Sequence, residues 1–196
     1  TGVDTTNERS GVLPSSAWKR AAMAQPWYPG ETISAGIGQG YMLATPMQLA
    51  AATGTLASRG QRYTPRLLRA VDGEELPPQA LQPVSAPEAD WAAVFDGMRE
   101  VVHGERGTAN YLSEDIAYEM AGKTGTAQVI GIAQGEDYNE EEVAERHRHH
   151  GLFIAFAPLQ APSIAVAIIV ENGGGSSAAA PIARAVIDTW LQGGAG

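Results

Sequence analysis

The sequence predicts an α+β fold in which helices cover an antiparallel sheet. Residues 152–157 and 163–170 are almost continuously apolar, and only a short connection separates them, which favours an antiparallel hairpin. Strands without a polar side indicate that both faces of the sheet are covered. Apolar residues at helical spacing near residues 87–103 and again after residue 177 predict the helices that cover it.

The composition limits the classes of function that the chain can have. Its 196 residues suffice for one domain with a substantial core. The 13 Lys and Arg against 22 Asp and Glu give a net charge of −9, which argues against binding to nucleic acid or to an anionic membrane surface. The absence of cysteine excludes disulfides and thiolate metal sites. No apolar run approaches the ~20 residues of a membrane-spanning helix, and the first residues lack the pattern of a signal peptide.

The first half of the chain contains one well-marked helix. Residues 1–44 are rich in Gly, Pro, Ser and Thr, which predicts an extended segment with short helical turns. Thr45 and Gln48 form a capping-box pattern, and Pro46 stands at the first helical position. A helix is therefore expected to follow, to run to about residue 58 and to end at Gly60.

Shorter elements are expected between this helix and the next. Residues 64–71 predict a short strand followed by a turn at Asp72 and Gly73, and residues 74–86 predict little regular structure. An amphipathic helix is expected over residues 87–103. Its core-facing stripe consists of Trp91, Val94, Phe95, Met98 and Val102.

The second half predicts the strand with the most distinctive chemistry. Thr108 is expected to cap a short helix through Leu112, and a strand is expected over residues 117–129. A polar excursion over residues 134–150 precedes the apolar hairpin, and a last helix is expected to begin near Pro181.

Lys123, Thr124, Gly125 and Thr126 give the strand over residues 117–129 its chemistry. The strand carries a cation and two hydroxyls, and the glycine leaves room for a second backbone to approach. These groups suit a site that holds a carboxylate and an oxyanion beside a serine nucleophile. The pattern Lys-Thr-Gly is the third motif of serine β-lactamases and penicillin-binding proteins, but three residues alone are a weak match.

Further segments, in the same order along the chain, closely resemble the C-terminal part of the transpeptidase domain of class B penicillin-binding proteins. Tyr138-Asn139 and Val143–Arg146 point to the elongation-type branch of that family, penicillin-binding protein 2 of Gram-negative bacteria. The resemblance covers essentially all of residues 1–196, which are expected to form the C-terminal part of one domain. The matching segments are Thr1–Asp4, Ser10–Pro14, Trp18-Lys19, Gly36–Leu49, Gly107–Ala109, Phe156–Pro158 and Glu171–Gly174.

The resemblance implies a peptidoglycan D,D-transpeptidase that works through an acyl-serine intermediate and is inhibited by β-lactams. Lys123 is expected to supply a positive field and to hydrogen-bond the serine of the S-x-N motif, while the hydroxyls of Thr124 and Thr126 hold the substrate carboxylate. The amide of Thr126 is expected to be one oxyanion donor. The family further implies stem peptides as substrates and a periplasmic domain on a single inner-membrane anchor. No cofactor and no metal are expected. A glycan polymerase of the SEDS class is the implied partner.

Two serine-containing patterns are interpreted as chance matches to the missing motifs. Ser16–Lys19 matches S-x-x-K, and Ser113–Asp115 resembles S-x-D. However, Ser16 lies in a stretch that the family places after both motifs, and Ser113 lies only ten residues before Lys123. The nucleophile is therefore expected upstream, in a part of the same domain. Residues 1–196 alone are expected to be inactive, and poorly soluble without their complement.

Other functions fit the residues less well. A serine β-lactamase or D,D-carboxypeptidase shares the motif, and a non-catalytic scaffold on a degenerate transpeptidase fold also remains open. A P-loop would need glycine where Ala117 stands, and the glycines of Gly36–Gly40 lack dinucleotide-binding spacing. Glu145, His147, His149 and His150 have spacings that metal sites use, but their charged neighbours favour an exposed, solvated segment.

Overall fold

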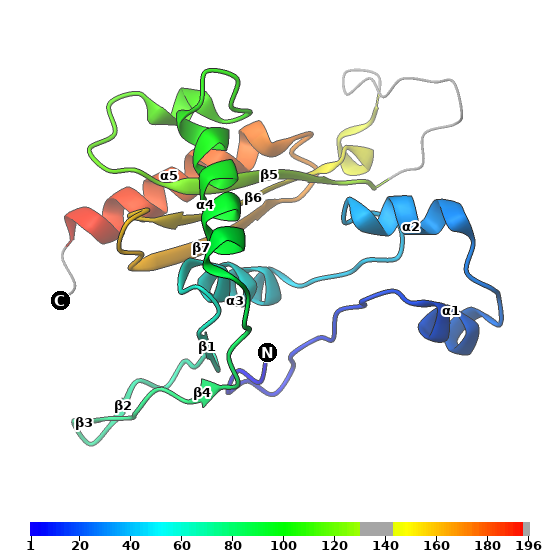
Figure 1. The fold of residues 1–196 in the computed structure, drawn as a ribbon, viewed down its shortest axis with the longest axis horizontal. Helices are drawn as coiled ribbons and strands as arrows, with labels where there is room; N and C mark the ends of the chain where they lie inside the picture. Colours follow the sequence, from blue (N-terminus) through cyan, green and yellow to red (C-terminus); the bar gives the residue numbers. More distant parts are fainter. Residues whose placement is uncertain (130–142, 194–196) are drawn as a thin grey trace.

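The computed structural model describes residues 1–129 and 143–193, and its centre is a three-stranded antiparallel sheet (Figure 1). The strands are β5 (Ala121–Ala127), β6 (His150–Ala157) and β7 (Ile164–Val170), in the order β5-β6-β7. Thr124 lies opposite Phe153, and Phe153 lies opposite Ile168. The expected apolar hairpin is thereby confirmed, and β5 occupies an edge of this sheet.

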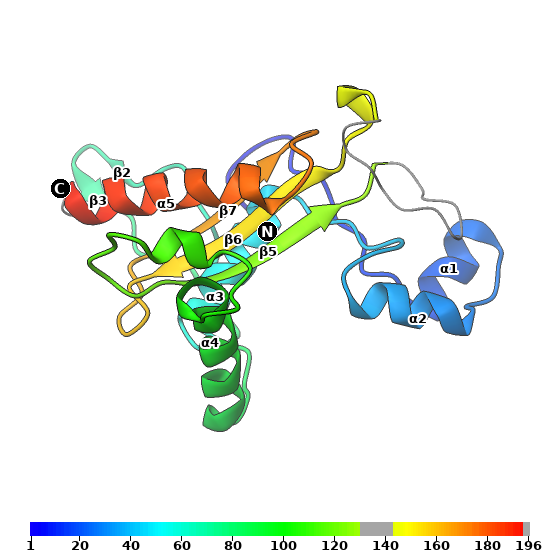
Figure 2. The ribbon, with the colours of Figure 1, turned by 90° about the horizontal axis from the view of Figure 1, so that it is seen from above.

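Helices cover both faces of the sheet, as the apolar strands predicted. Helix α5 (Ser176–Gln192) lies on one face, and α3 (Pro46–Ala57) and α4 (Glu88–His103) lie on the other (Figure 2). Alternate residues of β6 divide between the two sides: Phe153 packs in the cluster with α5, and Phe156 packs in the cluster with α4. Both phenylalanines are fully buried, so the sheet has a core on each side.

Helix α3 begins as its sequence predicted. The side chain of Thr45 accepts a hydrogen bond from the amide of Gln48 at 3.1 Å, and the Gln48 side chain accepts one from the amide of Thr45 at 2.9 Å. Gly60 follows the helix with a φ of +94°, and a Cβ there would lie 2.0 Å from the carbonyl oxygen of Val84. Glycine is therefore required at this position both by the backbone conformation and by space.

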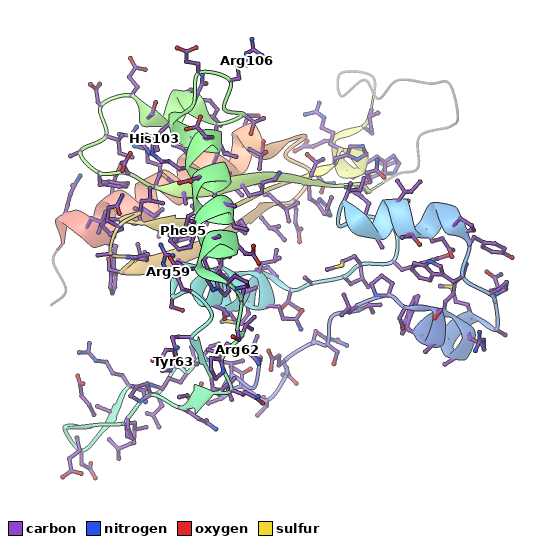
Figure 3. All side chains as sticks on the ribbon, in the orientation of Figure 1. Arg59, Arg62, Tyr63, Phe95, His103 and Arg106 are labelled. Carbon is purple, nitrogen blue, oxygen red and sulfur yellow. The ribbon has the colours of Figure 1, made fainter. Side chains whose placement is uncertain are left out.

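Helix α4 buries three residues of the predicted stripe, namely Phe95, Met98 and Val102. The inclusion of Val94 was wrong: its side chain is 43% exposed, because it lies at the margin of a stripe narrower than expected. The Phe95 ring lies 4.8 Å from that of Phe156, and the Arg59 guanidinium lies 4.6 Å from the Phe95 ring (Figure 3). These contacts fix α4 against the sheet and α3.

Two eight-residue helices, α1 (Ser16–Met23) and α2 (Pro29–Gly36), stand to one side of the sheet (Figures 1 and 2). Lys19 is only 1% exposed and pairs with Glu31, and its Nζ lies 4.4 Å from the centre of the Tyr28 ring. A buried charge needs such a partner. The short helical turns expected in residues 1–44 are thus two real helices held together by one ion pair.

The segment between α3 and α4 differs from its prediction. Within residues 64–71 only Ala70–Val71 (β2) is a strand, and it pairs with β3 (Glu74–Glu75) across the predicted turn. A further pair, β1 (Arg62–Tyr63) with β4 (Ala80–Leu81), gives residues 74–86 more order than expected. The strand propensity of the residues did not predict these elements, because each strand is two residues long and depends on pairing with its partner.

Three further elements differ from their predictions. The strand expected from residue 117 begins at Ala121, and helix α5 begins at Ser176 with Pro181 inside it. Residues 110–113 form a short 3₁₀ helix, η1 (Asn110–Ser113), which has no side-chain cap. The Tyr138-Asn139 pair lies outside the described residues. Within the described ranges, no helix is both long enough and apolar enough to cross a membrane.

Candidate active site

The Lys-Thr-Gly-Thr sequence lies on β5, along the edge that faces away from β6. Lys123 Nζ donates to the Thr124 carbonyl at 2.6 Å, and Gln39 Nε2 donates to the Thr126 carbonyl at 2.9 Å. Because the amide and carbonyl of one residue in an antiparallel strand point to the same side, the amides of Thr124 and Thr126 face this free edge too. The strand therefore presents backbone groups and two hydroxyl-bearing residues at an open edge.

A groove of about 520 Å³ runs beside this edge. One wall is the segment over residues 37–43, which follows α2, and the other is β5 itself. Lys123 and Thr126 are exposed, while Thr124 and Gly125 are half-buried. The groove is lined by Ile37, Gly38, Gln39, Gly40, Met42, Leu43, Lys123, Thr124, Gly125, Thr126, Ala127, Gln128, Leu152 and Ser176.

Thr108 belongs to the surroundings of this strand rather than to a helix cap. Its hydroxyl oxygen lies 3.0 Å from that of Thr124. The cap expected from Thr108 was wrong, because the chain folds back after α4 and directs this side chain towards β5. The family resemblance included Gly107–Ala109, but no local pattern predicted this contact, which depends on tertiary structure.

The glycines of β5 have different surroundings. A Cβ on Gly122 would lie 2.5 Å from Cζ of Phe153, so the buried ring excludes any larger residue there. A Cβ on Gly125 would lie 3.3 Å from Cβ of Leu152, which is tight but touches a side chain only. Gly122 thus serves the core, whereas Gly125 lies in the groove wall.

A histidine anchors the start of the strand. His103 Nε2, at the end of α4, accepts a hydrogen bond from the amide of Met120 at 3.1 Å. Burial, followed by the nearby Arg99 guanidinium, lowers the pKa of His103. Both effects favour the neutral imidazole, which is the form that can accept this hydrogen bond.

Residues of both serine patterns form contacts away from β5. The Ser113 hydroxyl donates to the carbonyl of Asn110 at 2.7 Å, and Ser16 opens α1, where Lys19 is paired with Glu31. Among the described residues that line the groove, neither serine is found. Lys19 is therefore not poised to activate a serine at β5.

The side chains of His149 and His150 contact the backbone. His149 Nδ1 accepts from the amide of Val129 at 3.2 Å, and His150 Nδ1 accepts from the amide of Asn172 at 2.9 Å. His149 is 4% exposed, so the expectation of a wholly exposed segment was wrong at this residue. Across residues 1–129 and 143–193, no group of three or more metal-ligating side chains is found.

A family comparison agrees with the fold. The penicillin binding protein transpeptidase domain matches residues 1–188. The chain belongs to this family. A peptidoglycan D,D-transpeptidase, MrdA of Escherichia coli strain K12, is 42% identical over 200 residues, which cover 98% of this chain and 31% of that protein. Residues 1–196 therefore span less than a third of the length of this relative.

Solved structures show the same penicillin-binding protein fold. Penicillin-binding protein 2 of Pseudomonas aeruginosa, in complex with WCK 5153, has a TM-score of 0.82 at 44% identity, covering 96% of this chain and 40% of that one. A chain of a peptidoglycan synthase complex that coordinates polymerization and crosslinking has a TM-score of 0.73 at 32% identity, with 96% and 29% covered. The predicted transpeptidase fold and the likeness to penicillin-binding protein 2 are confirmed.

Proposed function

We propose that residues 1–196 are the C-terminal part of the transpeptidase domain of an elongation-type peptidoglycan D,D-transpeptidase. The observation that carries this proposal is the Lys-Thr-Gly-Thr strand at an open sheet edge, where it lines a groove. Backbone amides at such an edge are preorganised donors for a developing oxyanion. Family membership and the likeness to MrdA support the same reaction.

In the proposed reaction, a serine oxygen attacks the carbonyl of the penultimate D-Ala of a stem peptide and the terminal D-Ala leaves. The amine of a neighbouring stem peptide then attacks the acyl-serine, which frees the serine and forms the crosslink. A β-lactam acylates the same serine, and opening of its ring takes the place of D-Ala release. The amide of Thr126 supplies one oxyanion donor, and the amide of the serine supplies the other.

The side chains of the strand have separate roles in this proposal. Lys123 provides a positive field near the serine, and the hydroxyls of Thr124 and Thr126 hold the carboxylate of the substrate or the β-lactam. Gly125 leaves the strand without a side chain between the two threonines. The exposure of Lys123 and Thr126 at the groove supports these roles.

The nucleophile and the S-x-N motif come, in this proposal, from an upstream part of the same domain. Two observations support it: the aligned relative is matched over 31% of its length, and Ser16 and Ser113 lie outside the groove-lining set of described residues. The whole protein is further proposed to be periplasmic on a single inner-membrane anchor, and to work with a SEDS-class glycan polymerase. The similar chain from a peptidoglycan synthase complex supports such a partner.

The test is the intact mass of the protein after incubation with a penicillin, compared between residues 1–196 and the full-length protein. An adduct on the full-length protein alone supports the proposal. Thr126→Pro, which deletes the oxyanion amide, is expected to slow acylation by ~10²–10³-fold. An adduct on residues 1–196 alone, or rapid hydrolysis of the adduct by the full-length protein, would argue for a different enzyme.

A further inference from the structure

The residue of most interest beyond the motif is Gln39, which lies between two glycines of unusual conformation. Gly38 has a φ of +74° and Gly40 a φ of +71°. A Cβ on Gly38 would meet nothing within 4 Å, so the backbone conformation, and not lack of space, favours glycine there. The Gln39 amide donates back to the carbonyl of Ser34 at 2.9 Å, which closes the loop onto the end of α2.

This loop directs the Gln39 side chain across the groove. Its Nε2 donates to the Thr126 carbonyl at 2.9 Å, over a separation of 87 residues. The donor is a neutral amide on a side chain with three rotatable bonds; Gln39 is half-buried and Thr126 is exposed. Among the described residues, it is the one side-chain hydrogen bond that joins residues 37–43 to β5.

The loop has further attachments, both within it and at its ends: the Tyr41 ring lies 5.4 Å from the ring of Trp18 on α1. Val12 and Leu43 exchange backbone hydrogen bonds of 2.8 and 3.0 Å, and α2 is joined to α1 through Glu31 and Lys19. Between these points, residues 37–42 form a groove wall. Among these attachments, the Gln39 hydrogen bond is the one that joins this wall to the strand.

We infer that Gln39 is a positioning residue, whose amide holds the wall formed by residues 37–43 against β5 and fixes the Thr126–Ala127 peptide at the groove edge. The inference rests on the proposed function, in which the neighbouring Gly125–Thr126 peptide donates its amide to the oxyanion. A fixed Thr126 carbonyl restricts rotation of the adjoining peptide. Loss of Gln39 then leaves the oxyanion donor less well oriented.

Three substitutions in the full-length protein separate this role from a general loss of structure. Gln39→Ala removes the donor, Gln39→Glu replaces it by an acceptor that repels the carbonyl, and Gln39→Lys keeps a donor of sufficient reach. The expected order of penicillin acylation rates is wild type and Lys highest, then Ala, then Glu. Loss of one hydrogen bond of this kind corresponds to a ~2–10-fold slower rate for Ala. Gln61→Glu, an exposed change of the same charge outside the groove, is the matched control and is expected to acylate as wild type does.

Hydrogen exchange gives a readout that does not need activity. Peptides covering residues 36–43 and 121–129 are expected to exchange faster in Gln39→Ala than in wild type or Gln61→Glu, with no change in the thermal unfolding midpoint. Unchanged exchange in both peptides would overturn the inference, and so would faster acylation in Gln39→Ala, which would show that Gln39 competes with the ligand for the Thr126 carbonyl. If wild type is not acylated at all, the proposed function fails, and the exchange comparison still decides the role of Gln39.

Discussion

The hydroxyl oxygens of Thr108 and Thr124 lie 3.0 Å apart, which joins the loop after α4 to the strand of the candidate site. The loop reaches β5 by folding tightly over the end of the helix. The amide of Ala109 donates to the carbonyl of Val101 at 2.9 Å, and a Cβ on Gly107 would lie 2.4 Å from that same oxygen. Gly107 thus permits the approach that places Thr108 beside Thr124.

Thr108→Val is expected to slow acylation of the full-length protein by penicillin. The substitution keeps the shape of the side chain and removes the hydroxyl that orients Thr124, whose own hydroxyl is proposed to hold the ligand carboxylate. One hydrogen bond contributes about 0.5–1.5 kcal/mol, so a ~2–10-fold loss is expected. Thr6→Val, at an exposed residue, is the control. Equal rates for both variants would show that Thr108 does not influence the site.

Gly151→Ala is expected to destabilise the domain. A Cβ at this residue of β6 would lie 2.0 Å from the carbonyl oxygen of Gly175, which directly precedes α5, so the helix and the sheet would have to separate. Overpacking of this kind costs about 1–3 kcal/mol in the free energy of unfolding. A lower midpoint of thermal unfolding is the measurement.

Gly97→Ala is the matched control, because the same substitution is expected to stabilise the domain at this position. Gly97 lies on the exposed side of α4, and a Cβ there meets nothing within 4 Å. Alanine in a helix interior is favoured over glycine by about 0.5–1 kcal/mol. A drop in the unfolding midpoint of Gly97→Ala would contradict the position of this helix.

Lower pH is expected to weaken the anchor at the start of β5. Burial and Arg99 lower the pKa of His103, against which Glu119 and Glu100 act in the opposite direction, and the neutral ring accepts from Met120. The unfolded chain therefore binds more protons at this residue below about pH 6.5. Its contribution to stability is complete above that pH and is lost as the pH falls from there through the lowered pKa.

The residue to replace is His103, labelled in Figure 3. The thermal unfolding midpoints of wild type and His103→Gln are compared from pH 7.5 to pH 5. Wild type is expected to lose more stability over this range than the variant, which has no titrating group at this residue. His147→Gln removes an exposed histidine and serves as control. Parallel curves for wild type and His103→Gln would contradict the role given to the imidazole.

Local patterns predicted elements whose determinants are close together in the sequence. Thr45 and Gln48 cap α3 because the capping box acts within one turn, and the apolar runs of β6 and β7 pair because a short loop joins them. Pro181 misled the boundary of α5: proline is favoured at the first position, yet here the helix starts five residues earlier. Burial of Ala179, Ala180 and Ala183 against the sheet offsets the missing amide.

The candidate site was only half predictable. Lys123 and Thr126 were recognisable because their motif is contiguous, whereas Thr108 and Gln39 reach the strand from segments 16 and 87 residues away from their partners. Gln39 did carry one signal, the glycines on either side of it, although their spacing does not match a dinucleotide-binding motif. The burial of Lys19 depends on the pairing of α1 with α2, which no local pattern encodes.

Ser16→Ala is expected to leave penicillin acylation of the full-length protein unchanged. Ser16 and Lys19 have the spacing of S-x-x-K, but a catalytic lysine must be free to take the proton of the serine. Lys19 is instead 1% exposed, paired with Glu31, and 4.4 Å from the centre of the Tyr28 ring. The same ion pair, followed by the Tyr28 amide, lowers the pKa of Glu31, which keeps the partner charged at neutral pH. Mass spectrometry of the acylated protein after proteolysis decides the matter: an adduct that disappears in Ser16→Ala, or that maps to residues 16–19, would move the nucleophile into this chain.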